Sequence, residues 1–366
     1  MTTPNDLAPA EPLLSLRNVS RSFVMRRHLS GRPREVVHAV DDVSLEVNAG
    51  ATLGIVGESG SGKSTLGRLA LRLVEADQGE ITFADHDLRA QTPARLRALR
   101  PDLAMIFQDP YSALDPRWTV GRSVAEPLRA AGAGDAASHR AAVAEMLGLV
   151  GLDAGAIDRT PDAFSGGQRQ RIVIARALIL RPRLVFCDEP VSALDVSTRA
   201  QVLRLLRDLQ KELSLTYLFV SHDLGVVAAM SDRIAVMYLG SIVEIGPADA
   251  VAGRCRHPYT ASLVSASPAP DPLAQRARRR VVLAGDPPSP IDPPSGCAFH
   301  PRCPLARPIC TTRKPELRIG ADGHAVACHA TAGEPRLKGE ELLARMTRFT
   351  PAENVAQLPI AEGTSR

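Results

Sequence analysis

Nine consecutive residues, 57 to 65, have the types and the spacing of a loop that binds phosphate. They read Gly-Glu-Ser-Gly-Ser-Gly-Lys-Ser-Thr and fit the pattern G-x-x-x-x-G-K-S. The glycines let successive backbone N–H groups point inward at an anion. The lysine can reach the terminal phosphates, and the serine hydroxyl can bind Mg²⁺. The pattern predicts a nucleoside triphosphate bound by Gly57, Glu58, Ser59, Gly60, Ser61, Gly62, Lys63, Ser64 and Thr65.

The residues on either side of this loop have the patterns that it needs. The apolar run at 53–56 predicts a buried strand before the loop. Leu66, Leu69, Ala70 and Leu73 recur at helical spacing after it. A helix that starts at the loop adds the positive end of its dipole to the anion site. We therefore expect a strand, the phosphate loop and a helix in direct succession.

A second polar sequence opens another predicted helix, at residues 165–168. Ser165 and Gln168 are spaced as a capping box, in which each side chain caps the backbone of the other. Gly166 and Gly167 leave the N-terminus of this helix uncovered, so an anion can approach its free N–H groups. Taken alone, the sequence is better explained by an ordinary capped surface helix.

Two apolar runs end in polar residues that can do chemistry. The run at 184–187 ends in Asp188 and Glu189, and the run at 217–220 ends in Ser221, His222 and Asp223. Ligands of open α/β sheets bind at the carboxyl ends of the strands. These side chains are therefore candidates for the same site as the phosphate loop.

Together these motifs resemble those of ATP-binding cassette (ABC) proteins, over residues 13 to 255. The phosphate loop, Gln108, the Ser-Gly-Gly-Gln sequence, Asp188-Glu189, the loop at 192–195 and His222 appear in the family's order. Where the family usually has leucine before the serine, this chain has Phe164. The resemblance implies an α/β P-loop NTPase domain with an antiparallel β subdomain and a helical subdomain at about 110–164.

The resemblance also implies roles for single residues in ATP hydrolysis. Glu189 would polarise the attacking water, Lys63 would neutralise phosphate charge, and His222 would contact the γ-phosphate. Magnesium would be held by Ser64 and Asp188, with Gln108 sensing both the metal and the water. Phe23 aligns with the aromatic residue that stacks on adenine, although a place in the core of an N-terminal strand explains it equally well.

Relatives in this family work as head-to-tail pairs. Ser165, Gly166, Gly167 and Gln168 would then cover the ATP of a second cassette, identical or homologous. This chain has one set of motifs, so it needs such a partner. ATP binding would close the pair and hydrolysis would loosen it.

Length and composition limit the alternatives. The 366 residues allow one large domain and a small one, and a hydrophobic content of 45% is ordinary for a globular chain. The net charge of +4 is modest, so we expect no nucleic-acid partner. We find neither an apolar run long enough to span a membrane nor a secretory signal. We expect a peripheral protein at the cytoplasmic face of the cell membrane, with any pore formed by other polypeptides.

Composition and motifs divide the chain into segments. We expect a disordered N-terminus at 1–12, the cassette at 13–255, a C-terminal domain at 256–332 and a tail at 333–366. Within the cassette, Val143, Met146, Leu147 and Val150 predict a helix of the helical subdomain. By resemblance, the stretch with Asp109, Pro110, Tyr111 and Trp118 would contact membrane subunits, although core packing explains Trp118 equally well.

The C-terminal domain resembles that of the ATP-binding subunits of oligopeptide and dipeptide importers, with nickel importers as near relatives. The resemblance rests on His257-Pro258-Tyr259-Thr260, on Gly285-Asp286-Pro287-Pro288 and on the cysteine-containing region from Gly296 to His329. It implies two transmembrane permease subunits and, indirectly, an extracytoplasmic peptide-binding protein. The alternatives are a nickel importer subunit, a soluble ABC ATPase acting on DNA or ribosomes, and a regulatory module without turnover. Glu189 and His222 argue against the last of these.

Four cysteines lie in this C-terminal region: Cys297, Cys303, Cys310 and Cys328. In a chain expected in the cytosol, clustered thiols favour metal binding over disulfides. Four thiolates can hold zinc or an iron–sulfur cluster. The spacing C-x5-C-x6-C-x17-C lacks the tight C-x2-C of zinc ribbons, and the resemblance to peptide-importer subunits favours a 4Fe–4S cluster. Simple reduced thiols remain an alternative.

Overall fold

The computed structural model describes residues 12–27, 33–267, 281, 283, 285–331 and 338–347. The chain divides into two units. The first comprises Met1–Arg21, Asp42–Gly54 and Ser64–Ser221, and the second comprises Ser22–Asp41, Ile55–Lys63 and His222–Arg366. Strands β1 (Leu14–Arg27), β2 (Pro33–Val47) and β3 (Thr52–Val56) begin in one unit and end in the other. The disorder expected at 1–12 concerns residues that, apart from residue 12, lie outside the described part of the chain.

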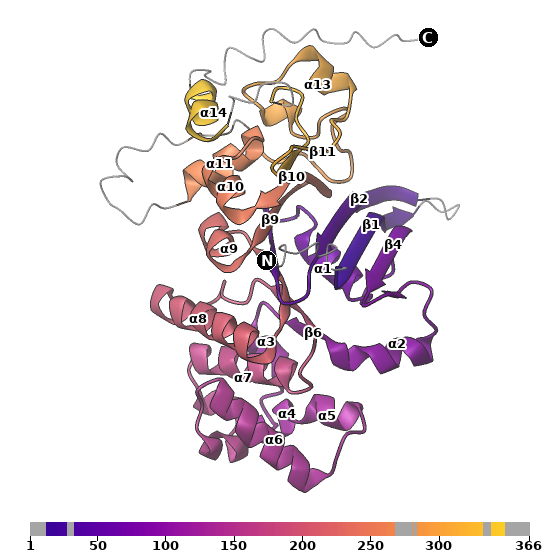
Figure 1. Ribbon diagram of the computed structural model, residues 1–366. Helices are drawn as coiled ribbons and strands as arrows, with labels where there is room; N and C mark the ends of the chain where they lie inside the picture. Colours follow the sequence, from indigo (N-terminus) through magenta and orange to yellow (C-terminus); the bar gives the residue numbers. More distant parts are fainter. Residues whose placement is uncertain are drawn as a thin grey trace, which may run out of the picture. The chain divides into compact units, whose positions relative to one another are not determined.

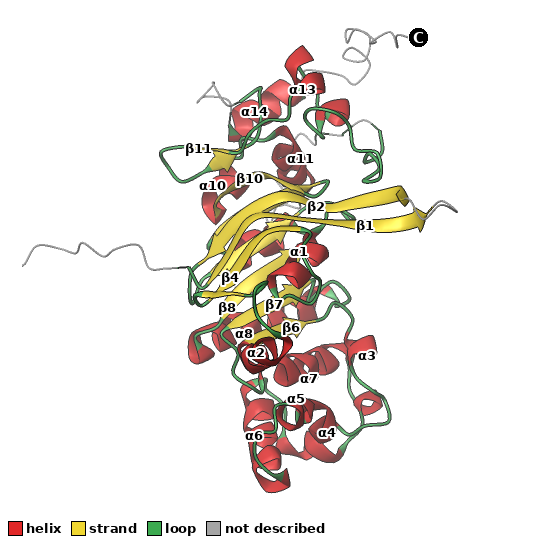
Figure 2. Ribbon diagram, turned by 90° about the vertical axis from the view of Figure 1, so that its right-hand side faces the viewer, coloured by secondary structure: helices red, strands yellow, loops and turns green. Residues whose placement is uncertain are grey.

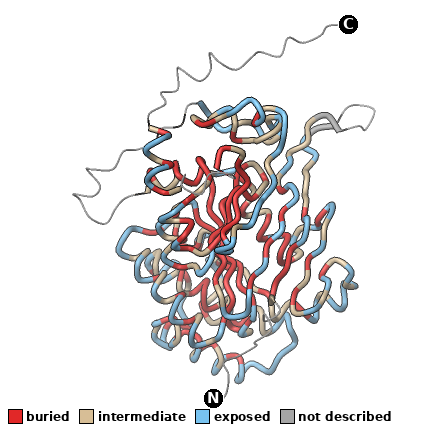
Figure 3. The backbone as a smooth tube through the Cα atoms, turned by 45° about the horizontal axis from the view of Figure 1, so that its top comes forward, coloured by how far each residue is buried: buried red, intermediate tan, exposed pale blue. Residues whose placement is uncertain are grey.

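The first unit is built on parallel strands, in the order β3-β8-β7-β6. Strand β6 (Leu103–Ile106) pairs in parallel with β7 (Leu184–Asp188), and β7 pairs in parallel with β8 (Thr216–Ser221). Every residue of β7 and β8 is buried, as the continuous apolar runs predict (Figure 3). Helix α1 (Lys63–Ala70) approaches β7 closely at Gly67, where an added Cβ would lie 2.1 Å from the Phe186 ring.

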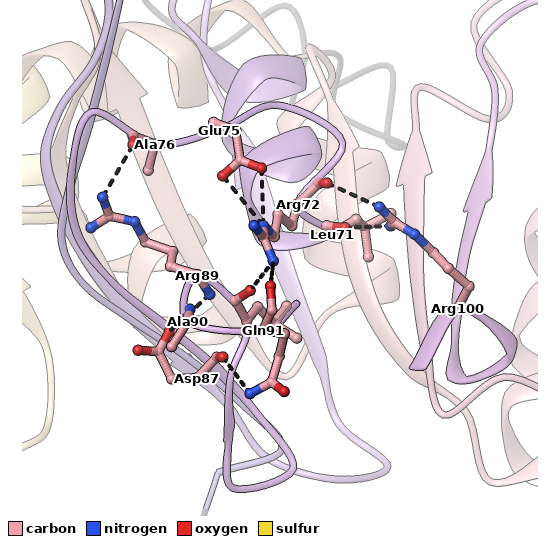
Figure 4. A network of polar contacts seen from close by, with 10 residues as sticks. Leu71, Arg72, Glu75, Ala76, Asp87, Arg89, Ala90, Gln91 and Arg100 are labelled. Atoms are coloured by element: carbon pink, nitrogen blue, oxygen red, sulfur yellow. Dashed lines mark hydrogen bonds and ion pairs between the residues drawn. The ribbon is translucent and has the colours of Figure 1, made fainter. Parts of the chain in front are cut away.

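The same unit contains the antiparallel pairing that the resemblance implied. Strand β4 (Gln78–Phe83) pairs antiparallel with β1 and with the short β5 (His86–Asp87), and the sheet order is β2-β1-β4-β5. Two arginines tie the end of α1 to the segments that follow it (Figure 4). Arg72 donates to Leu88 O and Gln91 O, and Arg100 donates to Leu71 O and Arg72 O. Helix α2 (Pro93–Leu99) directly precedes Arg100.

Residues 110–164, all of them described, form helices and no strand, as predicted (Figure 2). On the longest of these helices, Val143, Met146 and Leu147 are buried at the predicted spacing. The helices are α3 (Pro110–Ala113), α4 (Val120–Val124), α5 (Glu126–Ala130) and α6 (Ala136–Leu149), with 3₁₀ turns at Ala154–Asp158 and Pro161–Ala163. Two further helices of the first unit are α7 (Gly166–Leu178) and α8 (Val196–Leu213).

The second unit contains antiparallel pairings of β10 with β9 and with β12, and of β11 with β12, in the sheet order β11-β12-β10-β9 (β9, β10 and β11 are labelled in Figure 1). Its strands are β9 (Arg233–Tyr238), β10 (Ser241–Pro247), β11 (Arg318–Ile319) and β12 (Ala325–Val326). Its helices are α9 (Leu224–Met230), α10 (Ala248–Gly253), α11 (Pro258–Ala266), α13 (Pro308–Thr312) and α14 (Gly339–Met346), with a 3₁₀ turn at His300–Arg302. Helix α14 lies in the segment expected as a tail, and its Leu342 and Met346 join a core with Ala261.

A buried carboxyl group joins the sheet of the second unit to the C-terminal segments. Glu244 of β10 has no exposed surface. It accepts hydrogen bonds from the backbone N–H groups of Arg256 at 2.6 Å and His257 at 3.0 Å. Its Oε1 also lies 2.7 Å from Nε2 of His324, which is itself buried. One side chain thus connects three separate segments.

Candidate nucleotide site

The phosphate loop lies between β3 and α1, as the sequence predicts. Two of its glycines are required by the close approach of neighbouring backbone. A Cβ at Gly57 would lie 2.2 Å from the carbonyl oxygen of Met237, and one at Gly62 would lie 2.1 Å from that of Ala39. Gly62 also has a φ of +103°, which favours glycine. A side chain at either position would deform the loop.

The Lys63 side chain lies over its own loop. It is 5% exposed, and Nζ donates to the carbonyl oxygens of Gly57 at 2.8 Å and Glu58 at 2.9 Å. The positive charge is therefore held beside the loop's backbone rather than in solvent. The role of Lys63 in phosphate binding stays a prediction.

In the first unit, Ser64 and Asp188 lie together. The Ser64 hydroxyl donates to Oδ1 of Asp188 at 2.7 Å, and Asp188 is 3% exposed at the end of β7. Arg68 Nη2 lies 3.9 Å from the other carboxylate oxygen. Mg²⁺ prefers oxygen ligands and is bound in proteins by one or two carboxylates together with substrate phosphates. A hydroxyl beside a carboxylate fits that preference.

Glu189 has an unusual backbone conformation. Its φ is +47°, a region that few residues other than glycine adopt. Its N–H donates to the carbonyl oxygen of Val220 in β8 at 3.0 Å, which helps to hold this conformation. Gln108 Nε2 lies 3.5 Å from Glu189 Oε2, a long contact that brings together two of the residues predicted to act on water. Such backbone outliers cluster at functional sites.

The predicted capping box at the start of α7 is confirmed. Gln168 Oε1 accepts from Ser165 N at 3.0 Å, and Ser165 Oγ accepts from Gln168 N at 3.4 Å. The two glycines between them differ in their surroundings. A Cβ at Gly167 would lie 2.3 Å from Thr198 Cγ2, whereas one at Gly166 would have no neighbour nearer than 3.5 Å. Gly167 is thus required by packing on α8, and Gly166 is not.

Two further predicted residues of the site, His222 and Phe23, lie in the second unit. His222 directly follows β8 and is exposed. The next residue, Asp223, caps α9 by accepting from the N–H groups of Gly225 and Val226. Phe23 lies on β1 and is half-buried. The γ-phosphate role of His222 and the adenine role of Phe23 stay predictions.

The first unit also contains a large cavity, of about 860 Å³, outside the stretch that we expect to contact membrane subunits. Its lining includes Met105, Phe107, Pro127 and Ala130, together with Arg97, Arg100, Glu126 and Arg176. The expected contact residues Asp109, Pro110, Tyr111 and Trp118 are not in this lining. The signal in the sequence is Phe107, an aromatic residue that directly precedes Gln108 and is 46% exposed.

The four cysteines of the C-terminal region are free thiols near one another. Burial raises the pKa of Cys297 to about 11, and the thiols of Cys310 and Cys328 add to this. Burial also raises the pKa of Cys303 and of Cys328. Across the described ranges, however, no group of three or more His, Cys, Asp or Glu side chains is arranged to hold a metal ion. The predicted cluster or zinc site therefore has no support in this geometry.

Known proteins match this chain over most of its length. Residues 40–192 match the family described as "ABC transporter", and residues 243–310 match "Oligopeptide/dipeptide transporter, C-terminal region". The oligopeptide transport ATP-binding protein AppF of Bacillus subtilis is 46% identical over 88% of this chain and 98% of the relative. For OppF of Escherichia coli the identity is 49%, over 81% of this chain and 89% of the relative.

A solved structure shares the fold. The dimeric ATP-binding cassette MJ0796, in a post-hydrolysis state with ADP and phosphate, matches with a TM-score of 0.57 and 29% identity. The match covers 64% of this chain and 98% of that one. Among the helices formed by the described residues, none has the length and apolar character to cross a membrane.

Proposed function

Because this chain belongs to the family of oligopeptide transport ATP-binding proteins, it is an ATPase that energises peptide import, and we propose that it works through the residues described above. The observation that carries this proposal is the phosphate loop between β3 and α1, followed at once by Ser64 in contact with Asp188. The comparisons do not favour a nickel importer or an ABC ATPase acting on DNA or ribosomes.

Each residue has one task in the proposed mechanism. Lys63 and the N–H groups of the loop bind the phosphates, and Ser64 with Asp188 binds magnesium. Magnesium held by these two residues would neutralise charge on the phosphates. Glu189 orients and polarises the attacking water, assisted by Gln108 at its side. His222 would contact the γ-phosphate.

A second cassette completes the proposed site. Ser165, Gly166, Gly167 and Gln168 start helix α7, whose first N–H groups have no partner within the helix. We assign these groups to the ATP held by a partner cassette, identical or homologous. Support comes from the solved relative, which is described as dimeric with ADP and phosphate.

The large cavity is the proposed contact with the membrane subunits. Its apolar side chains, Met105, Phe107 and Pro127, suit the apolar face of a short helix, and its arginines suit acidic residues beside that helix. We propose two transmembrane permease subunits, each with one such helix for a cassette to bind. The chain would then lie at the cytoplasmic face of the membrane, and peptides would reach the permeases from an extracytoplasmic binding protein.

The experiment is reconstitution of the whole transporter. The tagged chain is purified from solubilised membranes with its copurifying subunits, identified by mass, and placed in vesicles with ATP inside. We expect peptide uptake that depends on ATP and is abolished by Lys63→Ala. A complex that takes up peptide equally well with Lys63→Ala, or that lacks permeases altogether, would refute the proposal.

A metal at the four cysteines remains a separate proposal. It is prompted by the cysteine spacing and by their common location, since Cys297 N donates to Cys310 O at 2.8 Å and nearby thiols raise the pKa of Cys297 and of Cys303. The observed arrangement would have to contract to hold zinc or a 4Fe–4S cluster. Anaerobic purification with iron, sulfide and zinc assays decides between cluster, zinc and reduced thiols. Iron and sulfide near four atoms each per chain would support the cluster.

A further inference from the structure

The second residue of the phosphate loop is held by the C-terminal domain. The Glu58 carboxylate accepts two hydrogen bonds from Arg302, Nη1 to Oε2 at 2.8 Å and Nη2 to Oε1 at 3.2 Å. The Arg302 side chain is 9% exposed and that of Glu58 is 29% exposed. Paired charge-assisted bonds of this kind fix geometry as well as contributing energy. All these residues belong to the second unit.

The backbone of Glu58 is held as well. Its N–H donates to the hydroxyl of Tyr259 at 2.7 Å, and Tyr259 has no exposed surface. This N–H is therefore directed at the C-terminal domain. The bond fixes the orientation of the peptide group between Gly57 and Glu58, where the chain leaves β3 and starts the loop.

The two contacting residues are themselves rigidly placed. The ring of Tyr259 packs at 4.7 Å from that of Tyr238 and at 5.5 Å from that of Phe299. Phe299 immediately precedes the turn that carries Arg302. Burial disfavours the Arg302 charge, yet the pKa of Arg302 is raised because its interactions with Glu58 and Tyr238 together outweigh that cost. Packing of the buried aromatic residues thus fixes the positions of the Tyr259 hydroxyl and of the turn that carries Arg302.

The glycines of the phosphate loop make its backbone conformation dependent on outside contacts. Gly60 and Gly62 have positive φ, and glycine has many accessible backbone conformations. Phosphate binding requires several loop N–H groups to point at one anion together. A loop ordered beforehand loses less conformational freedom when its ligand binds. Contacts at Glu58, itself one of the residues predicted to bind the triphosphate, order the loop through its backbone N–H and its carboxylate.

We propose that Arg302 and Tyr259 are positioning residues for the phosphate loop, so that the C-terminal domain sets the affinity of this chain for ATP. The inference rests on the proposed function, because it assumes that the loop binds ATP. Neither side chain takes part in the chemical step. Loss of either should therefore weaken ATP binding and leave the rate at saturating ATP largely intact.

The test compares three variants of the full chain. Arg302→Gln and Glu58→Gln each break the ion pair, and Tyr259→Phe removes the acceptor hydroxyl while keeping the ring. ATP affinity of the purified chain is measured by titration, and KM and kcat are measured in the assembled transporter. We expect Kd and KM for ATP to rise about fivefold to tenfold, the scale of about 1 kcal/mol of lost ordering, with kcat within about twofold.

Two further variants separate positioning from general loosening. Lys314→Gln removes another ion pair of the C-terminal domain, Lys314 Nζ to Asp41 Oδ2 at 2.6 Å, which involves no loop residue. It should leave the KM for ATP unchanged. The exchange Glu58→Arg with Arg302→Glu re-forms the pair in reverse and should recover part of the lost affinity.

The outcomes are distinguishable. Wild-type affinity in Arg302→Gln and Tyr259→Phe, an equal loss in Lys314→Gln, or a fall in kcat without a change in KM would overturn the inference. Thermal unfolding checks that each variant folds, and Glu58→Gln decides the matter if Arg302→Gln does not. Failure of the proposed function looks different, since wild-type chain would then bind no ATP or would be indifferent to Lys63→Ala.

Discussion

The hydroxyl of Ser64 donates a hydrogen bond to Oδ1 of Asp188 at 2.7 Å, although 124 positions separate the two residues in the sequence. One residue begins a helix after the phosphate loop, and the other ends a buried strand. The fold therefore brings to one point the two oxygen-bearing side chains that we propose as magnesium ligands.

Asp188→Asn should raise the magnesium concentration needed for half-maximal ATP hydrolysis by at least about tenfold, because an amide oxygen replaces a charged ligand. The measurement is phosphate release against magnesium concentration at constant ATP. Asp208→Asn makes the same chemical change on the exposed face of α8 and should leave the curve in place. Equal curves for Asp188→Asn and wild type would exclude Asp188 as a metal ligand.

Glu189→Gln should keep ATP binding and reduce turnover by about 10²-fold to 10⁴-fold, the usual contribution of a positioned base. The variant should accumulate as a closed pair of cassettes in ATP, detectable by size-exclusion chromatography. Its matched control is Glu212→Gln on an exposed position of α8. Wild-type rates in Glu189→Gln would remove this residue from the mechanism.

The two glycines of the α7 N-terminus should respond differently to alanine. Gly166→Ala should fold like wild type and lose turnover, since the added methyl group meets no close neighbour in this chain but faces the proposed partner's ATP. Gly167→Ala should lower the free energy of unfolding by about 1–3 kcal/mol, because its Cβ overlaps Thr198 Cγ2. The variant should therefore unfold at a lower temperature.

Thr198→Ser removes that methyl group and should restore the stability of Gly167→Ala. Thermal unfolding and ATPase rates are compared for wild type, Gly166→Ala, Gly167→Ala, and Gly167→Ala combined with Thr198→Ser. Full activity of Gly166→Ala in the assembled transporter would contradict the role proposed for the α7 N-terminus.

A bulky side chain in the large cavity should uncouple the chain from its permeases. Ala130 lines the cavity and is exposed, so Ala130→Trp should lower copurification of the permeases while ATP binding by the free chain stays unchanged. Ala137→Trp, on an exposed position of α6 that does not line this cavity, is the control. Equal recovery of permeases with both variants would place the contact elsewhere.

Stability should depend on pH through His257. Burial lowers the pKa of His257 from 6.5 to about 3, and its Nδ1 accepts a hydrogen bond from Tyr259 N at 3.1 Å. Between these two values the unfolded chain therefore binds more protons than the folded one. The contribution of His257 to the free energy of unfolding is fully present above pH 6.5 and decreases as the pH falls below 6.5. Each pH unit in this range should cost about 1.4 kcal/mol.

His257→Asn offers Tyr259 N an amide oxygen as acceptor in place of Nδ1. Its side chain does not titrate in this pH range. Thermal unfolding of both chains between pH 7.5 and about pH 4.5 measures the difference, in which the contributions of other groups cancel. A constant difference across that range would show that His257 does not contribute to the pH dependence.

The elements around the ATP site could be predicted because their signals are local. The strand, loop and helix at residues 52–70, the capping box of Ser165 and Gln168, and the burial of Val143, Met146 and Leu147 each follow from a short stretch of sequence. Propensity, glycine content and spacing determine such features within one or two turns of chain.

What the sequence did not predict depends on long-range packing. Arg302 lies 244 positions from Glu58, and no pattern near either residue indicates the pairing. The large cavity combines residues of several helices and of β6, so only its exposed Phe107 gave a local signal. The cysteine spacing suggested a metal site, yet spacing alone does not determine how close four thiols on a proline-rich loop come together.

The buried carboxyl group of Glu244 links the cassette to the C-terminal segments and limits how they can be lost in evolution. This group is sealed from water, and its donors come from residues 256, 257 and 324. Deleting everything after α10 would remove all three donors together with the segments that contribute them, so water or other groups would have to take their place. We therefore expect relatives of the cassette that lack these segments to have a different residue at the matching strand position.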